Sequence, residues 1–355
     1  ITYSLDGGSN SGSNPSSYNV LYGVTFSNPS KKGYTFAGWY IDNVKVTGIN
    51  PGANATFTSS DDMYSKLASR TVGNKTVTAK WTPNTYTVSY NGNTNTGGST
   101  ESSAHTYDAE KSLTANGFTK TGYTFSGWNT KADGTGTPYA DKATVKNLAA
   151  GGSVTLYAQW TVNTYYLDLN GWLDGASNGG IAGYGTADVY VNGVQKANDV
   201  SDFYQKIPYG SKYEIKDIKP AAGHTYIGVH SGNLTGTMGT SNTGVVLEFV
   251  TNKYTVAYDA NGGTGSTASS SHTYDVAKTL TPNGFARTGY IFKGWNTAKD
   301  GKGTAYADKA SVKNLSSSNN VTVTLYAQWA PKVLTATFHR NFDSSDTTSF
   351  EQKFT

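Results

Sequence analysis

The sequence is distinguished first by what it lacks. None of its 355 residues is a cysteine, and charged residues make up only 15% of it. Without thiols, neither a disulfide framework nor a thiolate metal site can form, so packing alone must stabilise the fold. No run of about 18 apolar residues is present, and the chain opens on a strand-like segment rather than on a signal peptide. These residues therefore predict no insertion into a membrane.

Charge of one sign is also scarce. The formal net charge is +4, and no basic run is longer than the pair Lys31–Lys32. Proteins that bind nucleic acids usually gather lysine and arginine on one face. The sequence therefore predicts no nucleic-acid partner.

Glycine and tyrosine, in contrast, are abundant, with 41 and 26 residues. Tyrosine favours strands and glycine favours turns, so many short strands joined by tight turns are expected. A chain of this length also exceeds one ordinary core, since domains average about 150 residues. Several small β-rich units are predicted.

An internal repeat identifies those units. The segments that begin at His105 and His272 match at 31 of 44 positions without a gap. Such a period indicates a tandem array in which each unit contacts only its neighbours, and we expect the array to be elongated. A feature present in every unit is better explained as scaffold than as a unique active site.

Three motifs recur in order. An alternating opening strand, as in TYTVSY from Thr85, has the period of a strand with one buried face. The middle motif is GYTFAGW, GYTFSGW or GYIFKGW, from Gly33, Gly122 and Gly289, and the closing strand ends in AKW or AQW. These motifs divide the chain into modules one to four, at residues 1–82, 83–162, 163–251 and 252–330, and a partial module five at 331–355.

The segment YADKATVKNL and its counterpart separate the middle motif from the closing strand. Asp141 and Asp308 there can cap a turn or a very short helix. The predicted fold class is mainly β, and it is of the α+β type where this segment forms the helix.

Module three is a diverged copy. TVNTYYLDLNGW from Thr161 superposes on TPNTYTVSYNGN from Thr82 at a constant offset of 79. GHTYIGV from Gly223 then takes the place of GYTFSGW, and Val229 and Phe249 replace the two tryptophans of the repeat.

The opening strand, GYTFxGW and the closing LYAxW together resemble the Listeria–Bacteroides repeat, also called the internalin B repeat. The resemblance covers modules one, two and four, and it is weaker in module three. It implies a small β-grasp-like (ubiquitin-like) unit of a few strands and a short helix. Such units occur in tandem in bacterial cell-surface proteins, commonly as stalks of adhesins, and the resemblance implies no catalytic residues.

Six of the seven tryptophans occupy the repeat positions. Their recurrence favours a structural core over a ligand platform, because burying a large apolar side chain contributes roughly 2 to 3 kcal/mol. The predicted core tryptophans are Trp39, Trp81, Trp128, Trp160, Trp295 and Trp329.

The histidines do not show the spacing of metal ligands. His105 and His272 are the same repeat position, and no pair has the H-x3-H or HExxH spacing. His224 and His230 lie on one expected hairpin and can share a face, but two ligands do not define a site. No metal and no cofactor are predicted.

Acidic residues in the turns are expected to be structural. Asp133, Asp259 and Asp300 stand beside glycine or asparagine, in loops that supply one carboxylate each. Calcium needs six or more oxygens, whereas aspartate readily bonds its own backbone in a turn. No Ser/His/Asp constellation can be assembled, so the protein is predicted not to be an enzyme.

Trp172 is the exception among the tryptophans. It aligns with Asn93 at the tip of the first hairpin of module two, and Asn170, Asp174 and Asn178 flank it. An exposed indole there can stack on a sugar or anchor a protein, which makes these four residues a candidate ligand-binding site. Alternatively, Trp172 folds back over the core of module three to replace the lost tryptophans.

Two functions fit these features. The first is a stalk or spacer of an extracellular adhesin on a bacterial cell surface, since the junctions TPNTY, TVNTY and TNKY are short and restrict bending. The second is a module that binds a surface glycan or a host protein, centred on module three.

Module five carries two strand-like segments, LTATFHRN from Leu334 and SFEQKFT from Ser349. So short a segment cannot bury a core of its own. We expect it to be the start of a longer module that packs against module four or self-associates by strand addition.

Overall fold

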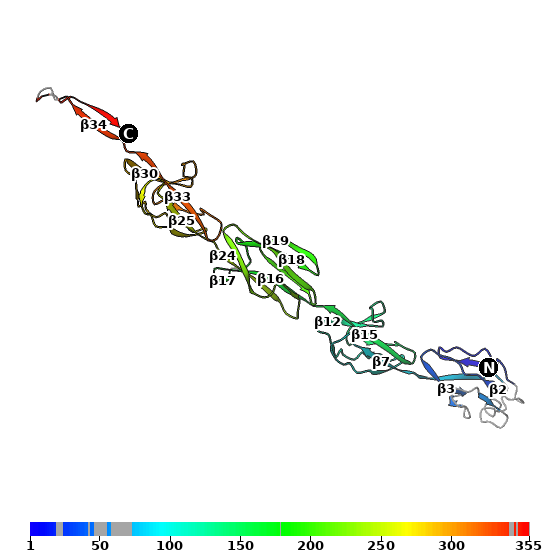
Figure 1. The fold of residues 1–355 in the computed structure, drawn as a ribbon. Helices are drawn as coiled ribbons and strands as arrows, with labels where there is room; N and C mark the ends of the chain where they lie inside the picture. Colours follow the sequence, from blue (N-terminus) through cyan, green and yellow to red (C-terminus); the bar gives the residue numbers. More distant parts are fainter. Residues whose placement is uncertain are drawn as a thin grey trace. The chain divides into compact units, whose positions relative to one another are not determined.

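The structure is a computed structural model. It describes residues 1–18, 24–41, 43–45, 55–57, 73–177, 179–340, 344–345 and 347–354. Its contacts define two compact units, Ile1–Asn163 and Thr164–Thr355. The first unit holds modules one and two, and the second holds modules three to five (Figure 1).

All regular structure among the described residues is β, so the short helix of the expected α+β fold is absent there. The Asp141 carboxylate instead accepts a hydrogen bond from the Asn116 N–H, at 2.9 Å. Lys142 and Asn147 have φ of 58° and 60°, a left-handed conformation that no right-handed helix includes. Asp141 therefore lies in a turn, and its carboxylate binds that turn to the segment at Asn116. In the part of the chain that the structure describes, no helix could cross a membrane.

Module two shows the repeat in full. Its sheet has the order β13-β12-β15-β7-β9, in which the first strand, β7, and the last strand, β15, run parallel at the centre. The other pairs are antiparallel, and β8–β11 and β10–β14 form two small hairpin-like sheets beside it. The strands are β7 (Thr85–Asn91), β8 (Gly97–Gly98), β9 (Ser103–Thr106), β10 (Lys111–Ser112), β11 (Phe118–Thr119), β12 (Tyr123–Asn129), β13 (Pro138–Tyr139), β14 (Thr144–Val145) and β15 (Gly152–Val162).

Module four repeats this arrangement, with the order β27-β25-β33-β30-β31 and a parallel pair β25–β33. Its strands are β25 (Lys253–Asp259), β26 (Thr264–Gly265), β27 (Ser270–Thr273), β28 (Lys278–Thr279), β29 (Phe285–Ala286), β30 (Tyr290–Asn296), β31 (Ala305–Tyr306), β32 (Ser311–Val312) and β33 (Val321–Pro331).

Module one keeps the same centre, with the order β1-β6-β3-β4 and a parallel pair β1–β6, and β2 pairs with β5. Its strands are β1 (Thr2–Ser4), β2 (Val24–Phe26), β3 (Tyr34–Ile41), β4 (Val44–Lys45), β5 (Ala55–Phe57) and β6 (Thr76–Pro83).

The second glycine of the GYTFxGW motif makes a β-bulge. The register between β12 and β15 shifts between Phe125 and Gly127, and Gly127 has φ of 144°. Glycine adopts this conformation without strain, and the bulge turns the next residue, Trp128, into the core, where it is 1% exposed. The same shift and positive φ occur at Gly38, Gly228 and Gly294.

Each of the four full modules has its own hydrophobic core. The cores of modules two and four are built from equivalent residues, and a tyrosine from the first strand packs against the central tryptophan in both, as in Tyr90–Trp128 at 4.7 Å. Among the described residues, module three has the largest core, in which Leu167, Leu169, Val189 and Ile215 are at most 2% exposed.

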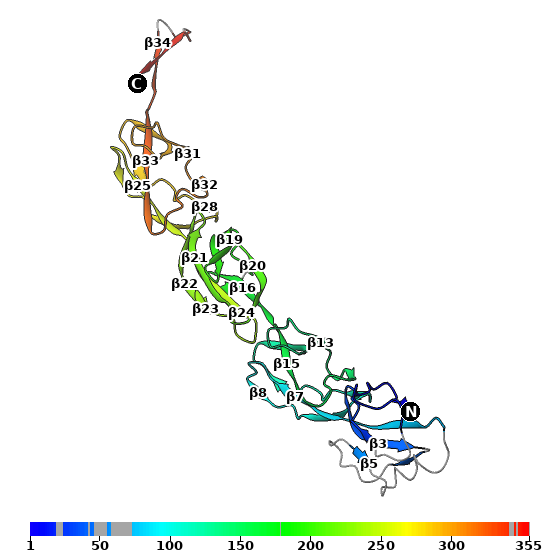
Figure 2. The same cartoon turned by 90° about the vertical axis from the view of Figure 1, so that its right-hand side faces the viewer.

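Module three gains this core by adding a second sheet. Its first sheet has the repeat's centre, with β16 parallel to β24 and β22 antiparallel to β24. A second sheet of order β19-β18-β21-β23 shares one core with it, and Figure 2 labels β19, β21 and β23 of this sheet near β16 and β24. The strands are β16 (Thr164–Leu173), β17 (Ala176–Ser177), β18 (Gly185–Val191), β19 (Val194–Val200), β20 (Phe203–Pro208), β21 (Lys212–Pro220), β22 (His224–Ser231), β23 (Thr235–Thr237) and β24 (Thr243–Thr251).

Module five is a single hairpin of β34 (Leu334–His339) and β35 (Ser349–Phe354). Phe338 and Phe350 stack on one face of it at 5.1 Å, yet both are exposed.

Candidate functional site

The first sheet of module three presents alternating side chains from β16. Leu167 and Leu169 point into the core and are 0% exposed, and Gly171 is buried beside the Tyr184 ring. The residues between them point the other way, because side chains alternate along a strand. We call this side of the sheet, with Tyr166, Asp168, Asn170, Trp172, Tyr204 and His230, the aromatic face.

Trp172 lies within β16, not at a hairpin tip. The turn follows at Asp174 and Gly175, whose φ values are 50° and 87°. The Asp174 carboxylate accepts hydrogen bonds from the Thr251 N–H, at 2.9 Å, and from the Thr251 hydroxyl, at 2.6 Å. Asp174 is exposed, and both of its carboxylate oxygens are used to tie the turn to β24.

The Trp172 indole stacks on the His230 imidazole, with ring centres 4.0 Å apart and planes inclined by 8°. His230 Nδ1 lies 3.9 Å from a Glu248 carboxylate oxygen. Trp172 is half-buried and lies outside the core of module three, whose aromatic members include Tyr184, Tyr213 and Phe249. The core thus contains other aromatic rings, and one of them, Phe249, takes the place of the closing tryptophan.

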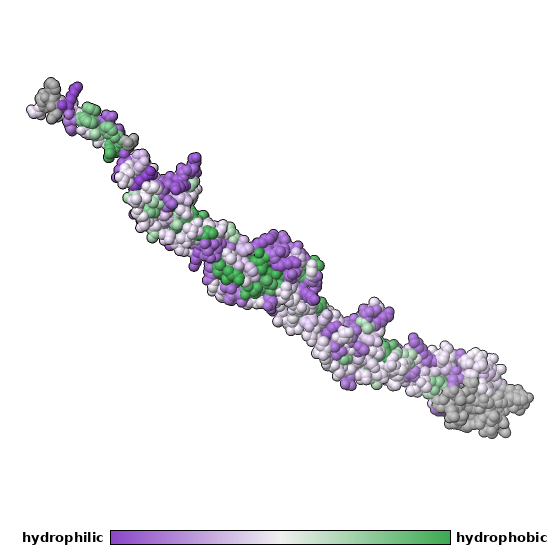
Figure 3. All heavy atoms as spheres, viewed as in Figure 1, coloured by the Kyte–Doolittle hydropathy of each residue, from purple (hydrophilic) through white to green (hydrophobic). Residues whose placement is uncertain are grey.

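Asn170 is also on the aromatic face, whereas Asn178 lies outside the described residues. A second ring pair stands further along the sheet. Tyr166 and Tyr204 stack with centres 4.1 Å apart and planes inclined by 7°, and the Lys206 ammonium lies 5.5 Å from the Tyr166 ring. Figure 3 shows hydrophobic atoms gathered on module three, with hydrophilic ones beside them.

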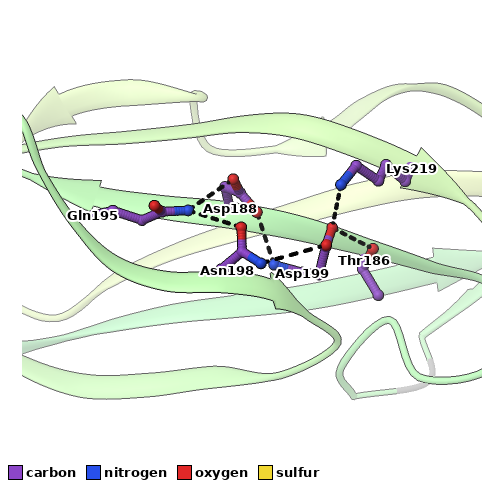
Figure 4. Close-up of polar contacts among 6 residues, drawn as sticks. All are labelled: Thr186, Asp188, Gln195, Asn198, Asp199 and Lys219. Atoms are coloured by element: carbon purple, nitrogen blue, oxygen red, sulfur yellow. Dashed lines mark hydrogen bonds and ion pairs between the residues drawn. The ribbon is translucent and has the colours of Figure 1, made fainter.

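A polar cluster occupies the second sheet of module three (Figure 4). Asp188, 5% exposed, accepts hydrogen bonds from Gln195 Nε2 at 2.9 Å and from the Asp199 N–H at 2.7 Å. Lys219 Nζ lies 2.6 Å from Asp199, and this hydrogen bond lowers the pKa of Asp199 and raises that of Lys219. The cluster fixes the irregular β18–β19 pairing, since Asp188 of β18 bonds both a side chain and the backbone of β19.

The tryptophans of the repeat occupy two kinds of position. Trp39, Trp128 and Trp295 are at most 1% exposed. Trp81, Trp160 and Trp329 are partly buried, and each indole N–H donates to a carbonyl at the tip of the first hairpin, as from Trp160 to Gly92 at 3.0 Å.

His105 and His272 are buried in modules two and four, each 1% exposed. His105 stacks on Tyr86, and its Nε2 lies 2.9 Å from the Ser103 hydroxyl. Burial, with a smaller effect of Lys111, lowers the pKa of His105, and His272 shows the same shift. Among the described residues, no three His, Asp or Glu side chains are grouped as a metal site would require.

The acidic turn residues bond their own loops. Asp133 accepts from the Thr135 N–H at 3.0 Å, and Asp259 from the Asn261 N–H at 2.7 Å. Asp300 accepts a hydrogen bond from the Lys302 N–H, at 3.1 Å.

An asparagine joins modules one and two. The Asn84 N–H donates to the Gly33 carbonyl at 2.9 Å, and its own carbonyl accepts from the Tyr107 N–H at 2.8 Å. Its side-chain oxygen accepts from the Thr35 hydroxyl at 2.6 Å, and its amide donates to the Ala150 carbonyl at 2.9 Å. One side chain thus binds both modules.

Asn252 does the same between modules three and four. It bonds Gly223 and Tyr274 through its backbone, at 2.8 and 2.9 Å, and Thr225 and Ser317 through its side chain, at 2.6 and 2.7 Å. Only 4% of Asn252 is exposed.

A tyrosine ring covers a glycine at each of these two joints. Tyr107 lies over Gly33 and Tyr274 over Gly223, so closely that a side chain on either glycine would overlap the ring. These contacts were not predicted from the short junctions, although asparagine recurs in them at 84, 163 and 252.

Comparisons with known proteins agree with the repeat motifs. The sequence profile of the Listeria–Bacteroides repeat domain matches residues 1–66, 86–159 and 254–328, which leaves module three unmatched. Two proteins of Evansella cellulosilytica, provisionally named as a Gly-rich membrane protein and a membrane protein, are 27% and 26% identical to the chain over 88% and 85% of its length. The chain spans 32% and 39% of these relatives.

Among solved structures, the Bacillus anthracis TIE protein is similar with a TM-score of 0.34 and 10% identity, over 78% of this chain and 54% of that one.

Proposed function

Because the chain belongs to the Listeria–Bacteroides repeat family, we propose that it is a spacer of a bacterial surface protein, an extracellular stalk that carries other domains and has no catalytic activity of its own. The central parallel pair of first and last strands supports a β-grasp-like unit, although the described residues lack its helix. The words membrane protein in the names of both relatives support a place at the cell envelope.

The repeated asparagine joint carries this proposal. A spacer must resist bending between its modules, and a joint with four hydrogen bonds through one residue restricts that motion. Because the Asn84 and Asn252 side chains are partly or fully buried, losing their bonds would leave the partner groups unsatisfied.

The joint can be tested by measuring distances between spin labels. The chain has no cysteine, so Lys80→Cys in module one and Lys131→Cys in module two give two unique and exposed labelling sites. We expect a narrow distance distribution in the parent chain. Asn84→Ala should broaden it, since the Thr35 and Ala150 contacts are then lost.

Asn91→Ala is the matched control, because Asn91 bonds only within its own hairpin. Its distribution should stay narrow. A distribution that is already broad in the parent chain, or that Asn84→Ala leaves unchanged, would contradict a stiff spacer.

A further inference from the structure

We propose that the aromatic face of module three binds a neutral polysaccharide chain lying along β16, a binding function beyond the spacer role. The proposed binding surface is a short row that starts with Tyr204 of β20 and Asp168 of β16 side by side, continues over Asn170 and ends at Trp172. Tyr204 is paired with Asp168 in the sheet, four residues along β16 from Trp172. At about 3.3 Å per residue, Asp168 and Trp172 are roughly 13 Å apart along β16.

The groups of this row are free to bind a ligand. Within the described part of the chain, the side chains of Asp168 and Asn170, the Tyr204 hydroxyl and the Trp172 indole N–H make no hydrogen bonds. Tyr204 and Trp172 each stack on one neighbouring ring, and neither makes a second ring contact there. Tyr204 is 55% exposed.

The equivalent residues of modules two and four are used differently. Asn93, in the place of Trp172, donates to the Ala132 and Ala158 carbonyls at 2.8 and 2.9 Å. Asn261 makes the matching bonds in module four. In module three, Asp174 makes the corresponding hydrogen bonds to the last strand, β24. The residue at position 172 is therefore not needed to hold the turn against that strand.

The arrangement of polar and aromatic groups favours a carbohydrate over a protein. The centre of a protein interface is depleted of charge, because an unpaired carboxylate such as Asp168 loses its hydration there. The hydroxyls of a sugar can instead donate to Asp168 and Asn170, and bonds to a charged acceptor are strong. The C–H face of a sugar ring packs on the electron-rich face of an indole or a phenol.

The charges of the aromatic face favour a neutral chain. Asp168 and Glu248 are acidic, and Lys206 lies over the Tyr166 ring at the opposite end from Glu248. An anionic polysaccharide would meet both carboxylates, which disfavours it.

Affinity gel electrophoresis of the full chain provides the test, with hydroxyethyl cellulose, xylan, mannan and laminarin as neutral probes and hyaluronan as the anionic one. We expect at least one neutral probe to retard the chain. Trp172→Ala and Tyr204→Ala should each weaken that binding tenfold or more, while module three keeps its cooperative melting transition because neither ring belongs to the core.

Tyr190→Ala is the matched control, since Tyr190 lies on the second sheet with the Lys216 ammonium 3.9 Å from its ring. It should bind within twofold of the parent chain. Failure of all four neutral probes, retardation by hyaluronan alone, or an equal loss in Tyr190→Ala would overturn the proposal. None of these outcomes bears on the joints, which use other residues.

Discussion

At the scale of single residues, tryptophans of identical chemistry have different roles because of their positions relative to the core. Trp128 is 1% exposed and contacts Tyr90, Phe118 and Phe125. Trp172 contacts one histidine on the surface. Burial, rather than residue type, should therefore determine the effect of truncation.

Trp128→Ala should lower the free energy of unfolding of module two by about 3 to 5 kcal/mol, because it leaves a large cavity. Trp172→Ala should cost module three clearly less, about 1 kcal/mol, because the half-buried indole lies outside the core and loses one ring contact. Hydrogen exchange followed by mass spectrometry resolves the modules separately. Strong iodide quenching of Trp128 in the folded chain, or a large loss on Trp172→Ala, would contradict these assignments.

The buried histidines make modules two and four sensitive to acid. The pKa of His105 and of His272 is lowered in the folded state, first by burial, so the unfolded state binds protons first as the pH falls. Above about pH 6.5 the histidine is neutral in both the folded and the unfolded state, so no stability is lost. Below it, each module should lose up to about 1.4 kcal/mol of stability per pH unit until the folded histidine is itself protonated.

Module three is the internal control, because Ile207 occupies the equivalent position, opposite Tyr165 as His105 is opposite Tyr86. Module stabilities from hydrogen exchange at pH 7.5 and 5.5 should diverge accordingly, and His105→Ile should remove the effect in module two. An equal loss in module three would show that other groups are responsible.

At the scale of elements, the bulge glycines offer a comparison within one chain. Gly127 and Gly228 share φ of 144°, but a Cβ on Gly127 would lie 2.8 Å from the Tyr139 carbonyl, whereas one on Gly228 meets nothing within 4 Å. Gly127→Ala should therefore cost about 1 to 3 kcal/mol, from backbone strain and this clash together.

Gly228→Ala should cost less, since only the strain remains. Thermal melts of the two variants measure the difference. Equal losses would mean that the backbone conformation alone requires glycine at the bulge.

Much of the element order was predictable because it is carried by local patterns. The alternation in TYTVSY and the GYTFxGW motif identified the central strands, and the family match confirms the repeat. Of the two alternatives predicted for the segment at Asp141, the turn forms and the short helix does not, since nothing local indicates that Lys142 and Asn147 adopt left-handed conformations.

The candidate site was predictable only in part, because only its local features can be recognised in the sequence. The offset of 79 singled out Trp172. Its stacking on His230 depends on the pairing of β16 and β22 with β24, which brings together residues far apart in sequence. The second sheet of module three was missed because the alignment to module two contains no counterpart of β18 and β19.

At the scale of the whole molecule, the repeat predicts an elongated chain in which modules contact only their sequence neighbours. A compact domain of 355 residues would have a radius of gyration of about 20 Å. Small-angle X-ray scattering should give a clearly larger value. A radius near 20 Å in a monodisperse monomer would contradict the array.

The parallel pairing of first and last strands also determines how a module would respond to pulling. Tension along the chain draws the start of β7 and the end of β15 in opposite directions along their common axis. Six residue pairs, from Gly152–Tyr86 to Tyr157–Asn91, are then sheared together instead of opening one after another. Because forced unfolding is governed by the rate of crossing this barrier, each such module should yield abruptly and at high load. The parallel order of these two strands thus predicts that each such module resists stretching until the whole pair separates.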